Sequence, residues 1–274
     1  VAAVVTDPVK HVKSAVIDPK LVPLAAALDP LLMKGMPKAI TAATGMDALT
    51  HAVEAFINRW PHADTEQHCV AAVRMIFGNL QRAYDDGSDM PAREAMALAS
   101  FYAGLAFTKA YVGYVHAFSH KLGGMYGVPH GLANAITLPY VLDFIKDAPL
   151  ARERLAKLAV VIGAGNATDA QDVLAQRFID RVRAPLAPER LAQLAVVIGA
   201  GTAGEPHDIL AQRFIERVRE LNRGVGIPDK VAALKPADVP TVARAAMVEA
   251  ARDYPVPKNM SLGEAETLLQ RMQA

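Results

Sequence analysis

The stretch TAATGMDALTHAVEAF, residues 41–56, combines an apolar helical pattern with two groups that are costly to bury. Asp47 and His51 are four residues apart, so on a helix they lie on the same face, about one turn from each other. Nearby side chains such as Val53 and Phe56 are apolar, which indicates a buried helix. A buried carboxylate beside an imidazole needs a cation or hydrogen bonds to compensate it. The stretch therefore predicts a core helix built around a polar site.

A second polar cluster follows in HAFSHKLGGMYGVPHG, residues 116–131. His116 and His120 repeat the four-residue spacing on another apolar segment. His130 comes after glycines and a proline that would let the chain turn back toward the same point. One histidine on an apolar face is more often a core residue than a ligand, but four histidines and an aspartate in two clusters favour a metal site. Zinc, iron(II) and other first-row divalent ions all suit such donors, and composition does not choose between them.

The pattern outside these blocks predicts a mainly α fold. From residue 36 onward, runs rich in Ala and Leu have apolar residues three and four apart, which is typical of amphipathic helices. We therefore expect an all-helical domain over residues 36–274. Residues 1–35 instead hold short β-branched stretches separated by Asp-Pro pairs, as short strands and turns would be.

A tandem duplication lies within residues 153–219. The segment 153–183 recurs 36 positions later as residues 189–219, with 23 of 31 aligned residues identical. Solenoids need about three units to bury a continuous core, so two copies do not predict one. Each copy is expected to form a helix, a Gly-Ala-Gly break and a second helix. Because the glycines follow a helix instead of a strand, they do not favour phosphate binding.

Composition excludes several classes of partner. Lys and Arg total 29 against 28 for Asp and Glu, a formal charge of +1, which gives no electrostatic case for nucleic acid or an anionic membrane. The most apolar stretch, residues 95–118, is broken by Lys109 and His116, and we expect a buried core helix there. A single cysteine and the lack of a signal-peptide pattern at the start of the chain predict a cytoplasmic location.

The two polar blocks carry a resemblance to a known family. Residues 41–56 and the block VGYVHAFSHKLGGMYGVPHGLANAITLP, residues 112–139, resemble the signature blocks of the iron-containing (group III) alcohol dehydrogenases. The likeness extends upstream through DPVKHVKSAVIDPKLVPLAAALDP and downstream to LNRGVGIPDKV. In that family one aspartate and three histidines hold one metal ion. Carried over position by position, the resemblance implies the ligands Asp47, His51, His116 and His130, with iron(II) as the ion and zinc as the alternative.

The resemblance also implies an activity and two further site residues. It indicates a metal-dependent alcohol dehydrogenase that transfers hydride between a small alcohol or aldehyde and NAD or NADP, with the metal polarising the substrate oxygen. His120 matches a further active-site histidine, expected to be catalytic by passing the substrate proton. Lys13 matches a lysine that approaches the dinucleotide. By family habit we expect a homo-oligomer, a dimer or higher.

The chain departs from the family pattern at its start. The family has an N-terminal α/β dinucleotide-binding domain with a glycine-rich loop, and that pattern is not found here. The resemblance thus implies that residues 1–35 are remnant strands and linker of that missing domain, and that the chain lacks most of the dinucleotide site. It also implies that one copy of the duplicated segment is surplus. Two alternatives remain open: a helical metallohydrolase in which the ion activates water, and a non-catalytic helical interaction protein.

Overall fold

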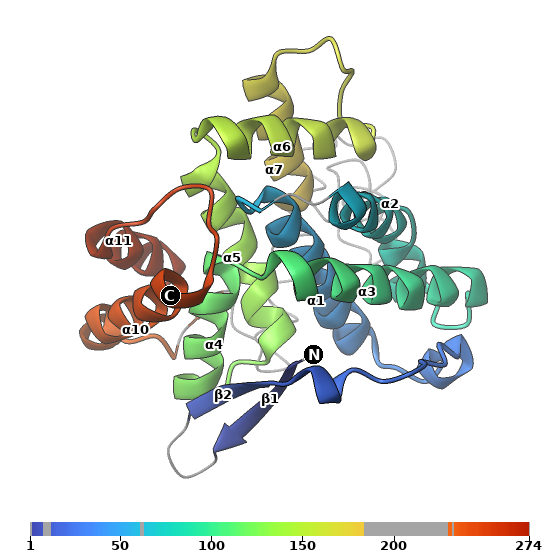
Figure 1. The fold of residues 1–274 in the computed structure, drawn as a ribbon, viewed down its shortest axis with the longest axis horizontal. Helices are drawn as coiled ribbons and strands as arrows, with labels where there is room; N and C mark the ends of the chain where they lie inside the picture. Colours follow the sequence, from blue (N-terminus) through green and yellow to red (C-terminus); the bar gives the residue numbers. More distant parts are fainter. Residues whose placement is uncertain (1, 8–11, 61–62, 184–229, 232, 274) are drawn as a thin grey trace, which may run out of the picture.

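The computed structural model describes residues 2–7, 12–60, 63–183, 230–231 and 233–273. It is mainly helical, which confirms the predicted fold class (Figure 1). The helices are α1 (Lys38–Ile57), α2 (Ala63–Asp85), α3 (Met90–Ala110), α4 (Tyr114–Tyr126), α5 (His130–Ile145), α6 (Pro149–Val161), α7 (Gln171–Arg183), α10 (Val239–Asp253) and α11 (Leu262–Met272), with short 3-10 turns η1 (Pro19–Leu21), η2 (Pro30–Met33) and η3 (Pro236–Asp238).

The segment before α1 holds a two-stranded antiparallel hairpin. Strand β1 (Ala2–Asp7) pairs with β2 (Val12–Ile17), and the register places Thr6 opposite Lys13. In the described part of the chain these two strands form the whole sheet. The expectation that they are left over from an α/β domain finds no support in this arrangement.

Helix α1 lies in the middle of the helical body and packs against α2, α3 and α5 (Figure 1). Its second half is buried nearly all round, because small residues such as Ala52 let neighbouring helices approach closely. The approach of α5 is closest at Gly131, where an added Cβ atom would lie only 2.3 Å from the carbonyl oxygen of Ala43. Glycine at this position therefore allows the start of α5, with His130, to lie close to α1.

The α3–α4 connection corrects the expectation of one core helix over residues 95–118. Helix α3 ends at Ala110, and Tyr111 takes a positive φ of 63° before α4 begins after Gly113. A φ in that region is rare for a bulky residue, so the turn is a strained one that surrounding contacts must hold. Within the described ranges no single helix is long and apolar enough to cross a membrane; α3 and α4 meet that length and composition only as a pair, bent by 105°.

The turn expected between His120 and His130 is confirmed. Helix α4 ends at Gly127, which adopts the left-handed conformation with φ 68°. Glycine is the usual residue at that position because it has no Cβ atom to clash. Pro129 then precedes α5, and α4 packs against both α5 and α10.

The first copy of the duplicated segment forms the helical hairpin that its pattern predicts. Helices α6 and α7 pack against each other, and the side chain of Phe178 on α7 is fully buried. Burying one such side chain stabilises the fold by about 1.5–3 kcal/mol. The second copy, residues 189–219, lies outside the described residues.

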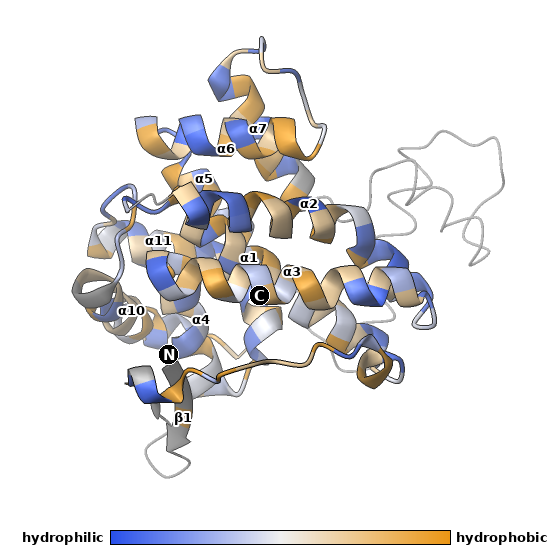
Figure 2. Cartoon of the chain, turned by 45° about the vertical axis from the view of Figure 1, so that its right-hand side comes forward, coloured by the Kyte–Doolittle hydropathy of each residue, from blue (hydrophilic) through white to orange (hydrophobic). Residues whose placement is uncertain are grey.

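The segment between β2 and α1 exposes apolar side chains. Figure 2 shows this hydrophobic stretch running along the lower edge of the molecule toward η2. Leu24, Leu31 and Leu32 are among its most exposed residues. Every residue from Leu21 to Asp29 is exposed, so this segment packs little of its apolar surface against the helices.

Candidate metal centre

Five of the six site residues predicted from the sequence meet where α1, α4 and α5 converge. Asp47 and His51 come from α1, His116 and His120 from α4, and His130 is the first residue of α5. The Asp47 carboxylate is central. Its Oδ1 atom lies 3.4 Å from His130 Nε2 and 3.9 Å from His116 Nε2, and its Oδ2 atom lies 3.8 Å from His51 Nδ1.

These distances fit a shared ion. Two atoms that each lie about 2.1 Å from one ion are at most about 4.2 Å apart, and all three contacts of Asp47 are shorter than that. The ligand atoms of Asp47, His51 and His116 form a group within 4.8 Å of one another; His130 lies outside this group, although its Nε2 atom is 3.4 Å from Asp47 Oδ1. One carboxylate with several imidazoles is a donor set that first-row divalent ions accept readily.

Burial keeps the two inner histidines neutral. Burial lowers the pKa of His51 to about 3, with the neighbouring His116 adding to the effect. Burial likewise lowers the pKa of His116 to about 3, although Asp47 opposes the shift. A neutral imidazole keeps one nitrogen lone pair, which is the form that binds a metal. Both rings are therefore ready to act as ligands at neutral pH.

The cluster is closed on one side and accessible on the other. The side chain of His116 is 2% exposed, whereas that of Asp47 is 25% exposed and that of His130 30%. His51 is covered by the ring of Phe107, with the ring centroids 4.3 Å apart. A small molecule could therefore reach the cluster from the side of Asp47 and His130.

Asn134 belongs to the cluster and was missed by the sequence analysis. Its Nδ2 atom donates a hydrogen bond to Asp47 Oδ1 and lies 3.2 Å from both His116 Nε2 and His130 Nε2. An amide nitrogen has two hydrogens and cannot donate to all three of these neighbours. Where both imidazole Nε2 atoms carry lone pairs, acceptors outnumber donors at this point, and a cation would satisfy them. The i+4 spacing from His130 to Asn134 along α5 is the signal that could have revealed it.

Glu54 supports the cluster from behind. Its carboxylate accepts hydrogen bonds from the backbone N–H groups of Gly113 and Val115, at 2.9 and 2.7 Å, and lies 2.6 Å from His116 Nδ1. Burial raises the pKa of Glu54 to about 7, against the lowering effect of the two backbone hydrogen bonds. Glu54 follows His51 by three residues on α1, and its side-chain partner is His116 on α4.

His120 has a carboxylate partner from the C-terminal part of the chain. Its Nδ1 atom lies 2.7 Å from Glu249 Oε1 on α10, and its ring stacks on His130 with centroids 5.3 Å apart. Lys121 and Tyr254 also contact Glu249. Burial raises the pKa of Glu249, but the hydrogen bonds from these neighbours outweigh it and hold the pKa at about 2. The carboxylate is therefore ionised and fixes His120 Nδ1 as a donor.

Lys13 is not brought to the cluster by anything the structure describes. Its backbone pairs with Thr6 in the hairpin, and its side chain lies outside the described part of the chain. Its role toward a dinucleotide stays a prediction.

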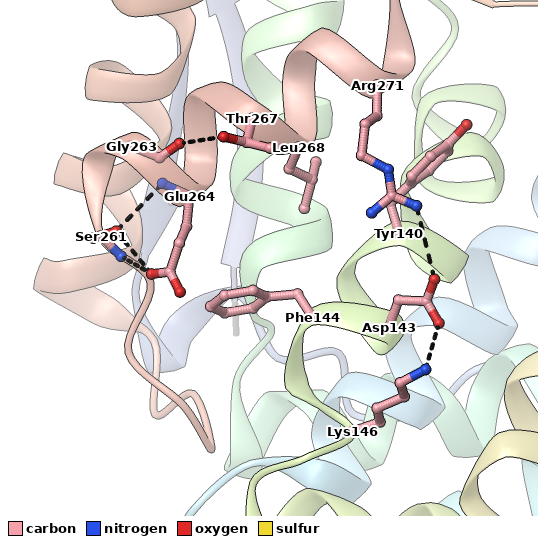
Figure 3. Close-up of a pocket in the computed structure, with 10 residues that line it drawn as sticks. All are labelled: Tyr140, Asp143, Phe144, Lys146, Ser261, Gly263, Glu264, Thr267, Leu268 and Arg271. Atoms are coloured by element: carbon pink, nitrogen blue, oxygen red, sulfur yellow. Dashed lines mark hydrogen bonds and ion pairs between the residues drawn. The ribbon is translucent and has the colours of Figure 1, made fainter.

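A separate cavity of about 530 Å³ lies between α5 and α11 (Figure 3). It shares no residue with the histidine cluster. Its polar groups satisfy one another, since Asp143 contacts both Lys146 and Arg271, and Ser261 and Glu264 form the capping box of α11. We therefore place the candidate site at the cluster and not in this cavity.

The comparisons with known proteins point to one family. Residues 41–187 match the model of the Fe-containing alcohol dehydrogenase family, C-terminal part. Alcohol dehydrogenase 4 of Schizosaccharomyces pombe is 42% identical over 180 residues, which are 66% of this chain and 41% of that protein. The 1,3-propanediol dehydrogenase of Klebsiella pneumoniae is 46% identical over 160 residues, which are 58% of this chain and 41% of that protein.

A solved structure extends the similarity to the fold. A 1,3-propanediol oxidoreductase superposes with a TM-score of 0.77 at 32% identity, over 99% of this chain and 61% of that one. An alcohol dehydrogenase from Oenococcus oeni gives the same TM-score at 29% identity, again over 99% of this chain and 61% of that one. The chain thus spans about two-fifths of the length of the curated relatives above.

Proposed function

The chain belongs to the iron-containing alcohol dehydrogenase family, and from this premise we propose that it is the metal-binding part of an NAD(P)-dependent alcohol dehydrogenase. The reaction would be the interconversion of a small alcohol and its aldehyde or ketone. The observation that carries the proposal is the convergence of one carboxylate and several imidazoles on the amide of Asn134, beside the His120–Glu249 pair.

Asp47, His51, His116 and His130 are the proposed metal ligands, with iron(II) as the ion and zinc as the alternative. When bound, a divalent ion supplies a Lewis acid that polarises an alcohol or carbonyl oxygen. The donor set suits such an ion, because first-row divalent ions accept imidazole nitrogen and carboxylate oxygen as ligands and the buried imidazoles of His51 and His116 are neutral. Asn134 and Glu54 hold Asp47 and His116 in place through hydrogen bonds.

His120 is the proposed catalytic residue for proton transfer. Glu249 accepts the hydrogen of His120 Nδ1, which leaves Nε2 as the nitrogen that can take a proton from the substrate hydroxyl. Because the side chain of His120 is 22% exposed, the proton can then pass to solvent. Lys13 is proposed to approach the dinucleotide.

The finer assignments are part of the same proposal. Residues 1–35 would be strands and linker from the dinucleotide-binding part, and residues 36–274 the metal-binding domain with its duplicated segment. We propose a homo-oligomer located in the cytoplasm, acting on small alcohols or aldehydes. Family membership favours oxidoreductase chemistry over the metallohydrolase and the non-catalytic alternatives.

Metal stoichiometry of the anaerobically purified chain tests the proposal. Inductively coupled plasma mass spectrometry should find close to one iron or zinc per chain, and the variants Asp47→Asn and His116→Ala should retain little of it. The control is Asp172→Asn, which changes an aspartate in the first turn of α7, outside the cluster. A full equivalent of metal in both cluster variants would overturn the ligand assignment.

A further inference from the structure

Glu54 lies on the same face of α1 as two of the proposed ligands. Asp47, His51 and Glu54 are spaced by four and three residues, so their side chains follow one stripe along the helix. The Glu54 side chain is only 3% exposed, and its Oε2 atom lies 2.6 Å from His116 Nδ1. Helix α1 therefore supplies two of the proposed metal ligands, Asp47 and His51, and also the carboxylate that contacts the Nδ1 atom of His116.

The carboxylate of Glu54 is enclosed by donors. Gly113 N–H donates to Oε2 at 2.9 Å and Val115 N–H donates to Oε1 at 2.7 Å, which joins the start of α4 to α1. A Cβ atom at position 113 would come within 2.8 Å of Oε1, so glycine is needed there for the carboxylate to fit. The ionised carboxylate can only accept hydrogen bonds, and it already accepts two from backbone N–H groups, so its contact with His116 requires the Nδ1–H of the imidazole.

The tautomer of His116 decides which atom it presents to the cluster. A hydrogen on Nδ1 leaves the lone pair on Nε2, and Nε2 is the atom that faces Asp47 at 3.9 Å and Asn134 at 3.2 Å. The opposite tautomer would place a hydrogen on Nε2, where it would block metal binding. Outer carboxylates that accept a hydrogen bond from a ligating histidine fix the ring and its tautomer in this way.

Asn58, the residue directly after α1, holds the same connection. Asn58 Nδ2 donates to the carbonyl oxygens of Ala110 and Val112, at 2.9 and 3.1 Å, on either side of the strained Tyr111. Asn58 is itself buried and does not contact His116 in any interaction recorded among the described residues. It therefore offers a way to loosen the turn without touching the imidazole.

We propose that Glu54 is a positioning residue that locks His116 in its Nδ1–H tautomer and anchors the start of α4, so that His116 Nε2 faces the metal cluster. The effect of the fixed tautomer on metal affinity rests on the proposed function, whereas the tautomer of His116 itself does not. Metal-free protein can therefore test the lock separately.

The test is an imidazole ¹H–¹⁵N correlation spectrum of the full chain in chelator, with the His116 signals identified by their loss in His116→Gln. Wild type should show the Nδ1–H tautomer, and Glu54→Gln should shift His116 toward Nε2–H, because the carboxamide NH₂ can donate to Nδ1. Zinc titration against a competing chelator should then show a 10- to 100-fold loss of affinity in Glu54→Gln. Asn58→Ala should leave the tautomer unchanged.

The outcomes separate the two proposals. A Nδ1–H tautomer in both wild type and Glu54→Gln, with equal zinc affinity, would overturn the role of Glu54. If wild type binds no zinc but its tautomer still changes in Glu54→Gln, the lock stands and the metal assignment fails. Should Glu54→Gln not fold, the wild-type spectrum still decides, because a Nε2–H tautomer there contradicts the lock.

Discussion

His120 Nδ1 lies 2.7 Å from Glu249 Oε1, although 129 residues separate the two along the chain. This contact brings α10 to the accessible side of the cluster. On the closed side, Glu54 contacts the buried His116. Each of the two α4 histidines thus has a carboxylate at its Nδ1 atom, and the two carboxylates come from different ends of the described chain.

Replacing Glu249 by Gln should destabilise the chain at neutral pH by about 1–3 kcal/mol, since a charged acceptor of several hydrogen bonds is lost. The folded-state pKa of about 2 lies below the ordinary value of 4.5, so the stabilisation is present above pH 4.5 and is lost as the pH falls toward 2. Urea unfolding at pH 7 and pH 3 should show a smaller acid loss in Glu249→Gln than in wild type. Glu94→Gln, which changes an exposed residue of α3, serves as control. Equal acid sensitivity in wild type and Glu249→Gln would contradict the assignment.

The metal-free chain should lose stability between pH 7 and pH 5. His51 and His116 have folded-state pKa values of about 3, so the unfolded chain takes up protons in this range and the folded chain does not. The pKa of Glu54 is raised to about 7, so the folded chain takes up a proton there as the pH falls, which stabilises it. This gain from one group is smaller than the loss from the two histidines. Chemical unfolding in chelator at both pH values measures the change, and His51→Gln should reduce it. A chain that is more stable at pH 5 would contradict the buried neutral histidines.

Gly131→Ala should destabilise the chain by about 1–3 kcal/mol and impair metal retention, because the new Cβ atom would lie 2.3 Å from the Ala43 carbonyl and push α5 away from α1. The matched control is Gly104→Ala on α3, where no atom lies within 4 Å of an added Cβ. That variant should be neutral or more stable by up to about 1 kcal/mol. Thermal unfolding and metal analysis compare the two, and equal behaviour would show that the α1–α5 contact does not set the site.

Asn134→Asp should destabilise the metal-free chain by about 1–3 kcal/mol, because a second carboxylate would then face Asp47 with no donor between them. Added zinc should reverse the loss, since a cation would compensate both charges. Unfolding temperatures with chelator and with zinc measure this difference. A variant that is destabilised equally under both conditions would show that Asn134 supports packing only.

The sequence predicted the cluster because its signals are local. The spacing from Asp47 to His51 and from His116 to His120, with the glycines before His130, is readable on single helices and one turn. The bend at Tyr111 was missed, because a positive φ in a tyrosine leaves no mark in composition. The partners of His116 and His120 were missed for another reason: hydrogen bonds between distant helices depend on packing, which one sequence does not encode as a pattern.

The position of Glu249 has a consequence for how the protein is made. All four proposed ligands have been synthesised once the ribosome reaches residue 130, whereas Glu249 follows 119 positions later. At 5–20 residues per second that interval lasts roughly 6–24 s. The four proposed ligands are therefore synthesised before the helix that carries Glu249, so the proposed metal site can form on the nascent chain before His120 has its carboxylate partner.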